Sequence, residues 1–458
     1  MSHYKPDPNK NVNLTINGIP VTVPEGTRIL EAAKKVNVNI PTLCDHPDLC
    51  RRSVCRLCVV ECDGREKLMA ACANDVWEGV NIVTNNLRLI NIRRTIIELL
   101  LANHPNDCLN CIRNKNCSLQ TLAADFNISN SAFFHTPDYP EKNENKTDVI
   151  IRDMSKCVKC GRCTEACQVN QAVCAINSSG RGIHYGIVTP YSQSLEESPC
   201  VFCGHCASVC PVGAIHEKEQ VSGLIKDLIK HENNIFIQFN PSLIETINEA
   251  IGFSQGDINT GKIITALKMI GFKKVFDSEI AENASINEEI QELLRHKKAN
   301  VSLPLITGCS HGFAKFVTTF FPDLEDRLYK GKSGQDNFCE EAGPITVSVE
   351  QCLAKKYKAK GIVLTVPEIV LMFKMMQINL KVLPESVFDV SLDEPQIKAP
   401  FKITCQDVKP GINSQEIEIY GIKIKVMTAG SYSDAGKIIE LIRRGECDAD
   451  YVRISGCK

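Results

Sequence analysis

The chain has 458 residues and nearly balanced charge, with 52 Lys and Arg against 54 Asp and Glu. This length suggests about three domains, and the balance gives neither the basic field of a nucleic-acid-binding protein nor an acidic tail. Without an apolar signal core or a long apolar run, we expect a cytoplasmic chain with no membrane partner. The 24 cysteines are therefore expected to bind metal rather than form disulfides, at a density typical of anaerobes.

The first predicted domain, residues 1–85, combines a hairpin, a helix and a group of cysteines. Residues 12–23 alternate as a β-hairpin with Asn17-Gly18 as its turn, and residues 28–36 have apolar side chains at helical spacing. This start predicts a β-grasp domain. Four of its cysteines have the spacing C-x10-C-x2-C-x13-C, which fits a [2Fe–2S] cluster, with a zinc ribbon as the alternative. These four are Cys44, Cys55, Cys58 and Cys72.

A second predicted domain covers residues 86–134. Residues 86–103 have Leu and Ile at helical intervals and predict an amphipathic helix. The helix leads into an H-x3-C-x2-C-x5-C pattern. A lone histidine is usually structural, but here it precedes three cysteines that are one ligand short of a [4Fe–4S] set. The predicted ligands of this histidine-ligated cluster are His104, Cys108, Cys111 and Cys117.

Two later cysteine runs predict a ferredoxin-like domain with two [4Fe–4S] clusters over residues 149–219. Each run has the spacing C-x2-C-x2-C-x3-C, in which three thiolates hold one cubane and the fourth crosses to the other cluster. Zinc sites have no use for a third and fourth cysteine in the same run. The first cluster is expected at Cys157, Cys160, Cys163 and Cys210, and the second at Cys200, Cys203, Cys206 and Cys167. Lys159 and Arg162 would stabilise the reduced first cluster, unless they are merely solvated.

Residues 220–458 change character. Strand-like runs such as 234–239, 274–277 and 361–365 alternate with helical stretches such as 241–251 and 261–270, as in α/β layers. The chain as a whole is therefore predicted as a multidomain α+β protein. No G-x-G-x-x-G follows a strand and no P-loop is present, so no flavin, nicotinamide or nucleotide site is expected.

The order of these motifs resembles the N-terminal half of large [FeFe]-hydrogenases, and the first two modules also resemble the large iron–sulfur subunit of respiratory complex I. The resemblance covers residues 12–215 and continues through Gly271–Asp277 and Phe320–Leu324 into the hydrogen-activating domain. It implies one [2Fe–2S] and three [4Fe–4S] clusters. It also implies a hetero-oligomer with a flavoprotein NAD(H)-binding subunit and a thioredoxin-like [2Fe–2S] subunit. Some such complexes bifurcate electrons at flavin, coupling NAD(P) to ferredoxin.

The resemblance is weaker at the hydrogen-activating centre, the H-cluster. In this family the H-cluster is bound by four cysteines that come from three motifs. The first motif, T-S-C-C-P-G-W, reads Thr307–Phe313 here, with Ser310 at the ligand position and Cys309 matching the proton-relaying thiol. The second keeps Cys352 and its lysines but not its Met-Pro. The third begins at Arg453–Cys457, and its last cysteine has no counterpart before Lys458. Because a hydroxyl is a poor ligand beside soft sulfide, we expect no H-cluster.

Residues 220–458 are accordingly predicted to be a degenerate hydrogenase-like domain that serves as a scaffold, in a chain without catalytic residues of its own. An alternative is that its cysteines regroup around another ion, although no regular spacing supports this. The six cysteines concerned are Cys309, Cys339, Cys352, Cys405, Cys447 and Cys457.

Three functional hypotheses follow from the sequence. The leading one is an electron-transfer subunit of a flavin-based, electron-bifurcating oxidoreductase, which relays electrons between an NADH-linked flavoprotein and ferredoxin or another catalytic subunit. The second is a divergent [FeFe]-hydrogenase that remains active with Ser310. The third is a redox sensor, although no recognisable output module is present.

Overall fold

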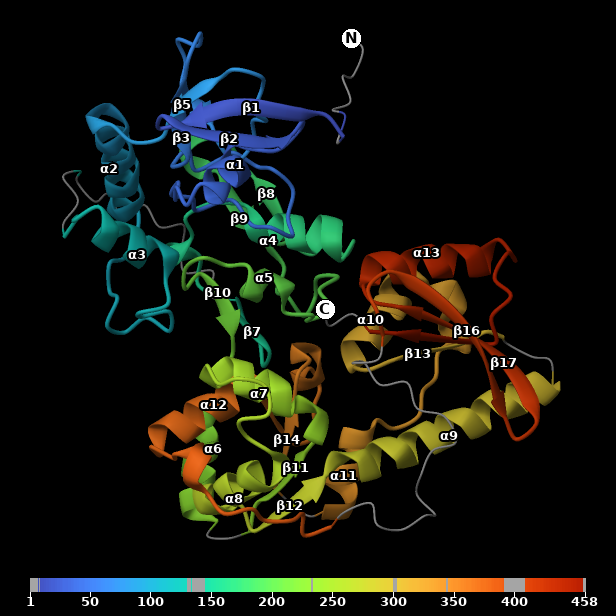
Figure 1. The fold of residues 1–458 in the computed structure, drawn as a ribbon. Helices are drawn as coiled ribbons and strands as arrows, with labels where there is room; N and C mark the ends of the chain where they lie inside the picture. Colours follow the sequence, from blue (N-terminus) through green and yellow to red (C-terminus); the bar gives the residue numbers. More distant parts are fainter. Residues whose placement is uncertain are drawn as a thin grey trace.

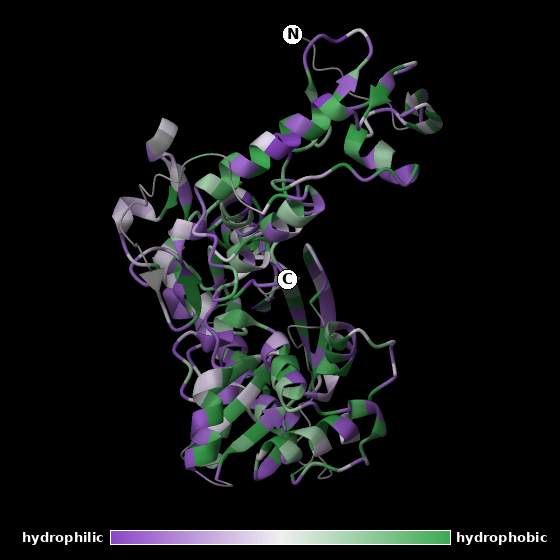
Figure 2. Cartoon of the chain, turned by 90° about the vertical axis from the view of Figure 1, so that its left-hand side faces the viewer, coloured by the Kyte–Doolittle hydropathy of each residue, from purple (hydrophilic) through white to green (hydrophobic). Residues whose placement is uncertain are grey.

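The structure is a computed structural model that describes residues 7, 9–129, 133, 145–231, 234–299, 303–342, 345–390 and 408–455. The cysteine-rich modules lie at the top and centre of Figure 1, and two α/β modules lie below and to the right. Helices alternate between hydrophobic and hydrophilic residues in Figure 2, as expected for helices with one buried face. Within the described ranges, no helix is both long and apolar enough to cross a membrane.

The first module is a five-stranded sheet with the strand order β2-β1-β5-β3-β4. The predicted hairpin is confirmed: Val12 pairs with Val23, and Asn17 and Gly18 both have positive φ, as a two-residue hairpin turn requires. The predicted helix is also present. The elements are β1 (Asn11–Ile16), β2 (Ile19–Pro24), α1 (Ile29–Lys35), β3 (Val59–Cys62), β4 (Met69–Ala70) and β5 (Asn81–Val83).

A helical segment follows, made of α2 (Leu87–Ala102) and α3 (Ser118–Asp125). The helix predicted over 86–103 is confirmed, and Asn86 caps it by accepting a hydrogen bond from the Leu89 N–H at 2.8 Å. The buried face of α2 carries Leu89, Arg93 and Ile97. This face packs the helix against the loops that carry the cysteines.

The central module holds the two later cysteine runs on short elements. A three-stranded sheet has the order β10-β7-β6, and β8 and β9 form a separate hairpin. Residues 180–185 form the tip of that hairpin. The elements are β6 (Asn145–Lys146), β7 (Ile150–Arg152), α4 (Arg162–Glu165), β8 (Asn177–Ser179), β9 (Gly186–Val188), α5 (His205–Ser208) and β10 (Ile215–Glu217).

The first α/β module is a parallel four-stranded sheet with the order β12-β11-β14-β15. Its helices bury an apolar core that includes Ile237, Ile263 and Val347, each with no exposed surface. The elements are α6 (Val221–Lys230), β11 (Phe236–Phe239), α7 (Ile244–Ile251), α8 (Thr260–Ile270), β12 (Lys274–Asp277), β14 (Thr346–Glu350), β15 (Ile362–Thr365) and α12 (Val366–Met375).

The second α/β module is a mixed sheet with the order β13-β18-β17-β16, in which only β16 runs antiparallel to its neighbour. The alternation of strands and helices is confirmed, but the strands divide between two sheets, which their sequence order does not reveal. The elements are α9 (Ser278–Ala299), β13 (Leu305–Gly308), α10 (His311–Phe320), β16 (Ile412–Ile419), β17 (Ile422–Ala429), α13 (Tyr432–Arg443) and β18 (Tyr451–Ile454). A further helix, α11 (Gly334–Ala342), packs against the first sheet, where the ring of Phe338 contacts that of Phe276 on β12.

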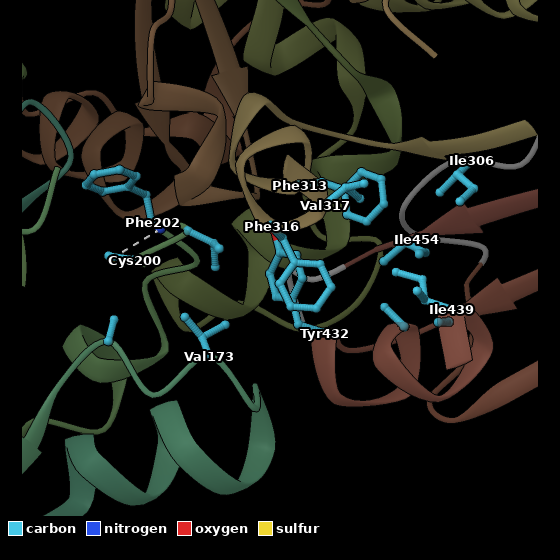
Figure 3. Close-up of a cluster of buried hydrophobic side chains, with 14 of the residues drawn as sticks. Val173, Cys200, Phe202, Ile306, Phe313, Phe316, Val317, Tyr432, Ile439 and Ile454 are labelled. Atoms are coloured by element: carbon cyan, nitrogen blue, oxygen red, sulfur yellow. Dashed lines mark hydrogen bonds between the residues drawn. The ribbon is translucent and has the colours of Figure 1, made fainter. Parts of the chain in front are cut away.

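One apolar cluster joins the central module to the second α/β module. Figure 3 shows Cys200 and Phe202 of the later cysteine run on one side, with Phe316 and Tyr432 beside them. The rings of Phe316 and Tyr432 have centroids 4.9 Å apart. The cysteine-rich and α/β parts of the molecule therefore share a hydrophobic core.

Candidate iron–sulfur centres

The four cysteines of the predicted [2Fe–2S] site come together from the loops that precede β3 and follow β4. The Cys44 thiol shares hydrogen bonds with those of Cys55 and Cys72, and the Cys58 thiol with that of Cys72. The hydrogen bond from Cys55 is the largest of the effects that lower the pKa of Cys44 to about 2. The same hydrogen bonds to Cys44 raise the pKa values of Cys55 and Cys72. Cys44, Cys58 and Cys72 are at most 2% exposed. Four thiols linked by hydrogen bonds, three of them buried, suit a cluster.

Two arginines hold the loops of this group. Arg93 on α2 is buried and donates from Nε to the Leu57 carbonyl at 3.1 Å and from Nη2 to the Val59 carbonyl at 2.8 Å. Arg28, before α1, pairs with Asp45 at 2.9 Å, next to Cys44. Sequence reasoning missed both arginines, because their acceptors lie far away in the chain.

His104 lies just beyond the C-terminus of α2, which directs it toward three cysteines of the following loop. It is 9% exposed, and its Nδ1 accepts a hydrogen bond from the Asn106 N–H at 3.4 Å. Its Nε2 is buried and has no hydrogen-bond partner. Burial, with a smaller contribution from Lys156, lowers the pKa of His104 to about 4. The imidazole is therefore neutral at pH 7, the form that binds metal.

The histidine and the three cysteines line one small cavity of about 20 Å³. Gly213 completes its wall, and a Cβ atom there would lie 2.7 Å from Cys111 Sγ, so a larger residue would push the thiol aside. A buried imidazole nitrogen without a partner costs free energy unless something binds it. The residues present thus fit an iron–sulfur cluster with three thiolates and one imidazole.

The two later cysteine runs repeat the same backbone conformation. In each run a non-glycine residue with positive φ precedes the second cysteine, and a glycine with positive φ follows it: Lys159 (54°) and Gly161 (76°), then Phe202 (57°) and Gly204 (82°). The turn aims the N–H of Lys159 at Cys157 Sγ and that of Phe202 at Cys200 Sγ, both at 3.4 Å. Such N–H···S bonds stabilise negative charge on sulfur.

The two runs exchange their last cysteines in space. Cys163 interacts electrostatically with Cys157, Cys160 and Cys210, although Cys210 belongs to the other run. Cys203 interacts in the same way with Cys200 and Cys167. Cys210 thus lies near three cysteines of the first run and Cys167 near those of the second, and the division into two ligand sets remains a prediction. We refer to them as the first cubane set (Cys157, Cys160, Cys163, Cys210) and the second cubane set (Cys167, Cys200, Cys203, Cys206).

Burial dominates the electrostatics of both sets. It raises the pKa of Cys157 to about 12 and that of Cys200 to about 11, and it also raises the pKa of Cys206 well above its usual value. A buried thiol with a raised pKa gives up its proton only to a strong competitor such as iron. These thiols are therefore suited to ligation and not to nucleophilic chemistry.

The first cubane set adjoins the [2Fe–2S] group. Cys160 interacts electrostatically with Cys44. Arg162, which sequence reasoning singled out, donates from Nη2 to the Asp45 carbonyl at 2.6 Å and also faces Cys160. Cys117 of the histidine-containing set packs against the same apolar cluster as Cys157 and Cys210, so the histidine-containing set also adjoins the first cubane set. All four sets are thus neighbours within one part of the molecule.

The residues that correspond to the H-cluster motifs line a separate cavity of about 200 Å³ between the two α/β modules. Cys309, Ser310 and Cys352 all lie on its wall, and the Ser310 hydroxyl is buried without a hydrogen-bond partner. Glu350 and Lys355 form a 2.7 Å ion pair on the same wall. Burial raises the pKa of Glu350.

Of the cysteines of the alternative metal hypothesis that lie within the described residues, Cys309 and Cys352 line this cavity, whereas Cys339 and Cys447 do not. Cys339 accepts a hydrogen bond from Thr346 Oγ1 at 3.0 Å, and Cys447 lies 3.8 Å from the sulfur of Met427. Cys352 is disulfide-bonded. Cys405 and Cys457 lie outside the described residues. Over the described ranges, no three His, Cys, Asp or Glu side chains converge on the position of a single metal ion.

Four family models match successive parts of the chain. Residues 9–87 match a 2Fe-2S iron-sulfur cluster binding domain, and residues 93–132 match the iron-sulfur binding region of NADH-ubiquinone oxidoreductase-G. Residues 156–214 match a 4Fe-4S dicluster domain, and residues 233–406 match the C-terminal domain of the iron only hydrogenase large subunit. The chain therefore combines 2Fe-2S and 4Fe-4S binding domains with a hydrogenase-like C-terminal domain.

Curated relatives match across these domains. The chain is 35% identical over 429 residues to the NADP-reducing hydrogenase subunit HndD of Solidesulfovibrio fructosivorans, covering 85% of this chain and 72% of the relative. It is 31% identical over 364 residues to iron hydrogenase 1 of Clostridium pasteurianum, covering 76% and 62%. It is also 36% identical over 159 residues to a subunit of the NADH-quinone oxidoreductase of Streptomyces coelicolor, covering 34% of this chain and 19% of that protein.

Proposed function

The chain belongs to the iron-only hydrogenase family, and we propose that it is an electron-transfer subunit that relays electrons through four iron–sulfur clusters. The gathering of fifteen cysteines and one buried histidine, whose Nε2 has no hydrogen-bond partner, into four neighbouring sets carries this proposal. The proposed ligands are Cys44, Cys55, Cys58 and Cys72; His104, Cys108, Cys111 and Cys117; Cys157, Cys160, Cys163 and Cys210; and Cys167, Cys200, Cys203 and Cys206.

The clusters would supply one-electron redox chemistry, and the protein's own residues would set where that chemistry occurs. Burial of the cysteines keeps water from the sulfurs. The N–H groups of Lys159 and Phe202 donate to sulfur and favour the more negative, reduced state. A neutral His104 in place of a thiolate leaves its set less negative than the others, which by analogy with histidine-ligated Rieske centres favours a higher potential.

We propose that the chain works inside a hetero-oligomer that transfers electrons at a flavin and bifurcates them between NAD(P) and ferredoxin. The names of the relatives support a subunit of a nucleotide-linked complex, because one belongs to an NADP-reducing hydrogenase and another to an NADH-quinone oxidoreductase. The flavin and the bifurcation follow from the family resemblance alone. The proposed partners are a flavoprotein NAD(H)-binding subunit, a thioredoxin-like [2Fe–2S] subunit, ferredoxin and a further catalytic subunit.

We also propose that the C-terminal domain carries no H-cluster and serves as a scaffold. Ser310 supports this, because it offers a hydroxyl where the family motif has a thiolate. A divergent, active hydrogenase is the second candidate, and one observation favours it: Cys309 and Cys352 still line a common cavity with Ser310. Infrared bands from carbonyl and cyanide ligands, together with hydrogen evolution from reduced viologen, would establish the second candidate and refute the first.

Metal analysis tests the proposed ligands. The full chain, purified without oxygen, should contain about fourteen irons, two from one [2Fe–2S] and twelve from three [4Fe–4S] clusters. Cys58→Ser should lose about two of these irons and the [2Fe–2S] electron paramagnetic resonance signal. Cys62→Ser is the matched control, because Cys62 is also buried in the same module but lies outside the set. Equal iron loss in both variants would contradict the assignment.

A further inference from the structure

One buried arginine interacts electrostatically with cysteines of both cubane sets. Arg152 is the last residue of β7, where it pairs with Ile215 of β10, and it is only 4% exposed. Its Nη2 donates to the Ile187 carbonyl at 2.9 Å and lies 3.7 Å from the sulfur of Met154. These contacts fix the guanidinium inside the central module, where it cannot reach solvent.

The charge of this arginine is not matched by a carboxylate. No ion pair found within the described ranges includes Arg152, and its Nε is buried without a hydrogen-bond partner. Its electrostatic neighbours are sulfurs instead, two from each cubane set. They are Cys157, Cys163, Cys200 and Cys206.

A guanidinium remains charged in proteins, and a buried charge is costly unless an opposite charge compensates it. A cubane with four thiolate ligands has a net negative charge, which grows by one on reduction. Two such sites within electrostatic reach of Arg152 would provide the missing counter-charge. In turn, a fixed positive charge beside both favours the reduced form of each.

We propose that Arg152 is a counter-ion shared by the two cubane sites and that it raises the reduction potential of both. This inference rests on the proposed function, because it requires clusters at both sets. Other basic residues are placed differently: Arg162 faces Cys160 of the first set, and Lys315 faces Cys200 of the second. Arg152 faces sulfurs of both sets, so its removal should change both potentials together.

The test is a redox titration of the full, cluster-loaded chain followed by electron paramagnetic resonance. In Arg152→Gln, the reduction equilibrium constant of each cubane should fall about tenfold, which for a one-electron couple is a decrease of about 59 mV. In Arg152→Lys, both cubane potentials should stay close to those of the unsubstituted chain, because lysine keeps the positive charge although it lacks the planar guanidinium. The [2Fe–2S] potential should not change.

Lys218→Gln is the matched control. It removes one positive charge from the same module, but from a side chain that is 41% exposed and paired with Asp148. It should leave both cubane potentials unchanged. A shift of only one cubane in Arg152→Gln, equal shifts in Lys218→Gln, or no shift at all would overturn the proposal.

Cluster content separates the remaining outcomes. If Arg152→Gln loses its cubane iron while Arg152→Lys keeps it, the compensating charge is supported. If both variants lose iron, Arg152 is a packing residue and the proposal is overturned. Failure of the proposed function looks different, because the unsubstituted chain would then lack the iron and labile sulfide of two cubanes.

Discussion

The cysteine-rich part of the chain, residues 9–217, and the α/β part, residues 221–455, hold their folds by different means. Among the described residues, thirteen of the sixteen non-glycine residues with positive φ lie in the cysteine-rich part. Such a conformation costs roughly 1–2 kcal/mol per residue. Several lie inside the cysteine loops, including Arg56, Lys159 and Phe202. Loops bent in this way need a stabilising centre.

The α/β part is instead organised around apolar layers. Ile237, Val347 and Val363 on neighbouring parallel strands have no exposed surface, and burial of such side chains stabilises a sheet at roughly 1.5–3 kcal/mol each. A domain with its own core of this kind can keep its fold after losing a cofactor. The comparison explains how a hydrogenase-like domain could persist as a scaffold without its catalytic centre.

Removing iron should have the largest effect and should separate the two parts. For metal sites that assemble on folding, the binding free energy is on the order of 10 kcal/mol. After chelation, amides around residues 44–62, 104–117 and 157–210 should lose their protection against hydrogen exchange. Amides of β11 and β14 should remain protected. Loss of protection in both parts would show that the α/β core is not independent.

Phe316→Ala should have the next largest effect, because it breaks the core that the two parts share. Phe316 is 2% exposed and packs against Tyr432. Truncating a buried phenylalanine costs about 4 kcal/mol of the free energy of unfolding. The urea midpoint of the loaded protein should fall by the corresponding amount. An unchanged urea midpoint would mean that the apolar core shared by the two parts contributes little to the free energy of unfolding.

Lys356→Met tests a buried ion pair that lies within the α/β part. Lys356 Nζ lies 2.7 Å from Glu368 Oε2, with side chains 0% and 4% exposed. Leaving the Glu368 charge buried without its partner should cost about 3 kcal/mol, measured by urea unfolding. The double variant Lys356→Met/Glu368→Gln should recover part of this loss. If it does not, the lost interaction is the bond from Lys356 to the Lys218 carbonyl.

Asp323→Asn should have the smallest effect. Asp323 forms a surface ion pair with Arg443, and exposed pairs of this kind are screened by water and salt. We expect no measurable change in the urea midpoint and no change in iron content. A clear decrease would indicate that surface charge matters more in the α/β part than its apolar core suggests.

Local features of the fold could be predicted well from the sequence. The Asn17-Gly18 turn and the helix from Leu87 to Ala102 depend on nearby residues, and both are confirmed. The pairing of the strands in the α/β part was harder to predict. The strands β13 and β14 follow one another along the chain but belong to different sheets. Strand pairing depends on which layers pack together, and the apolar sequence of a strand does not indicate which other strand it pairs with.

The ligand assignments remain predictions, although the structure gathers the cysteines into the predicted sets. The residues around them were largely missed. Arg93 and Gly213 had no pattern that marked them, since one bonds to distant carbonyls and the other is defined by its contact with Cys111. Arg152 precedes the first cysteine run by only a few positions, but nothing in the sequence indicated that it is buried.

The sequence by itself determined which side chains are available for iron and in what order they occur, because ligand spacing within a loop is a local property. It also determined that the motif position at residue 310 carries a hydroxyl. Only the tertiary structure brings Cys210 near the first run and Cys167 near the second, as the spacing predicted, and buries Arg152 within electrostatic reach of both sets. Those relations depend on long-range packing, which brings together and buries residues that the chain keeps apart.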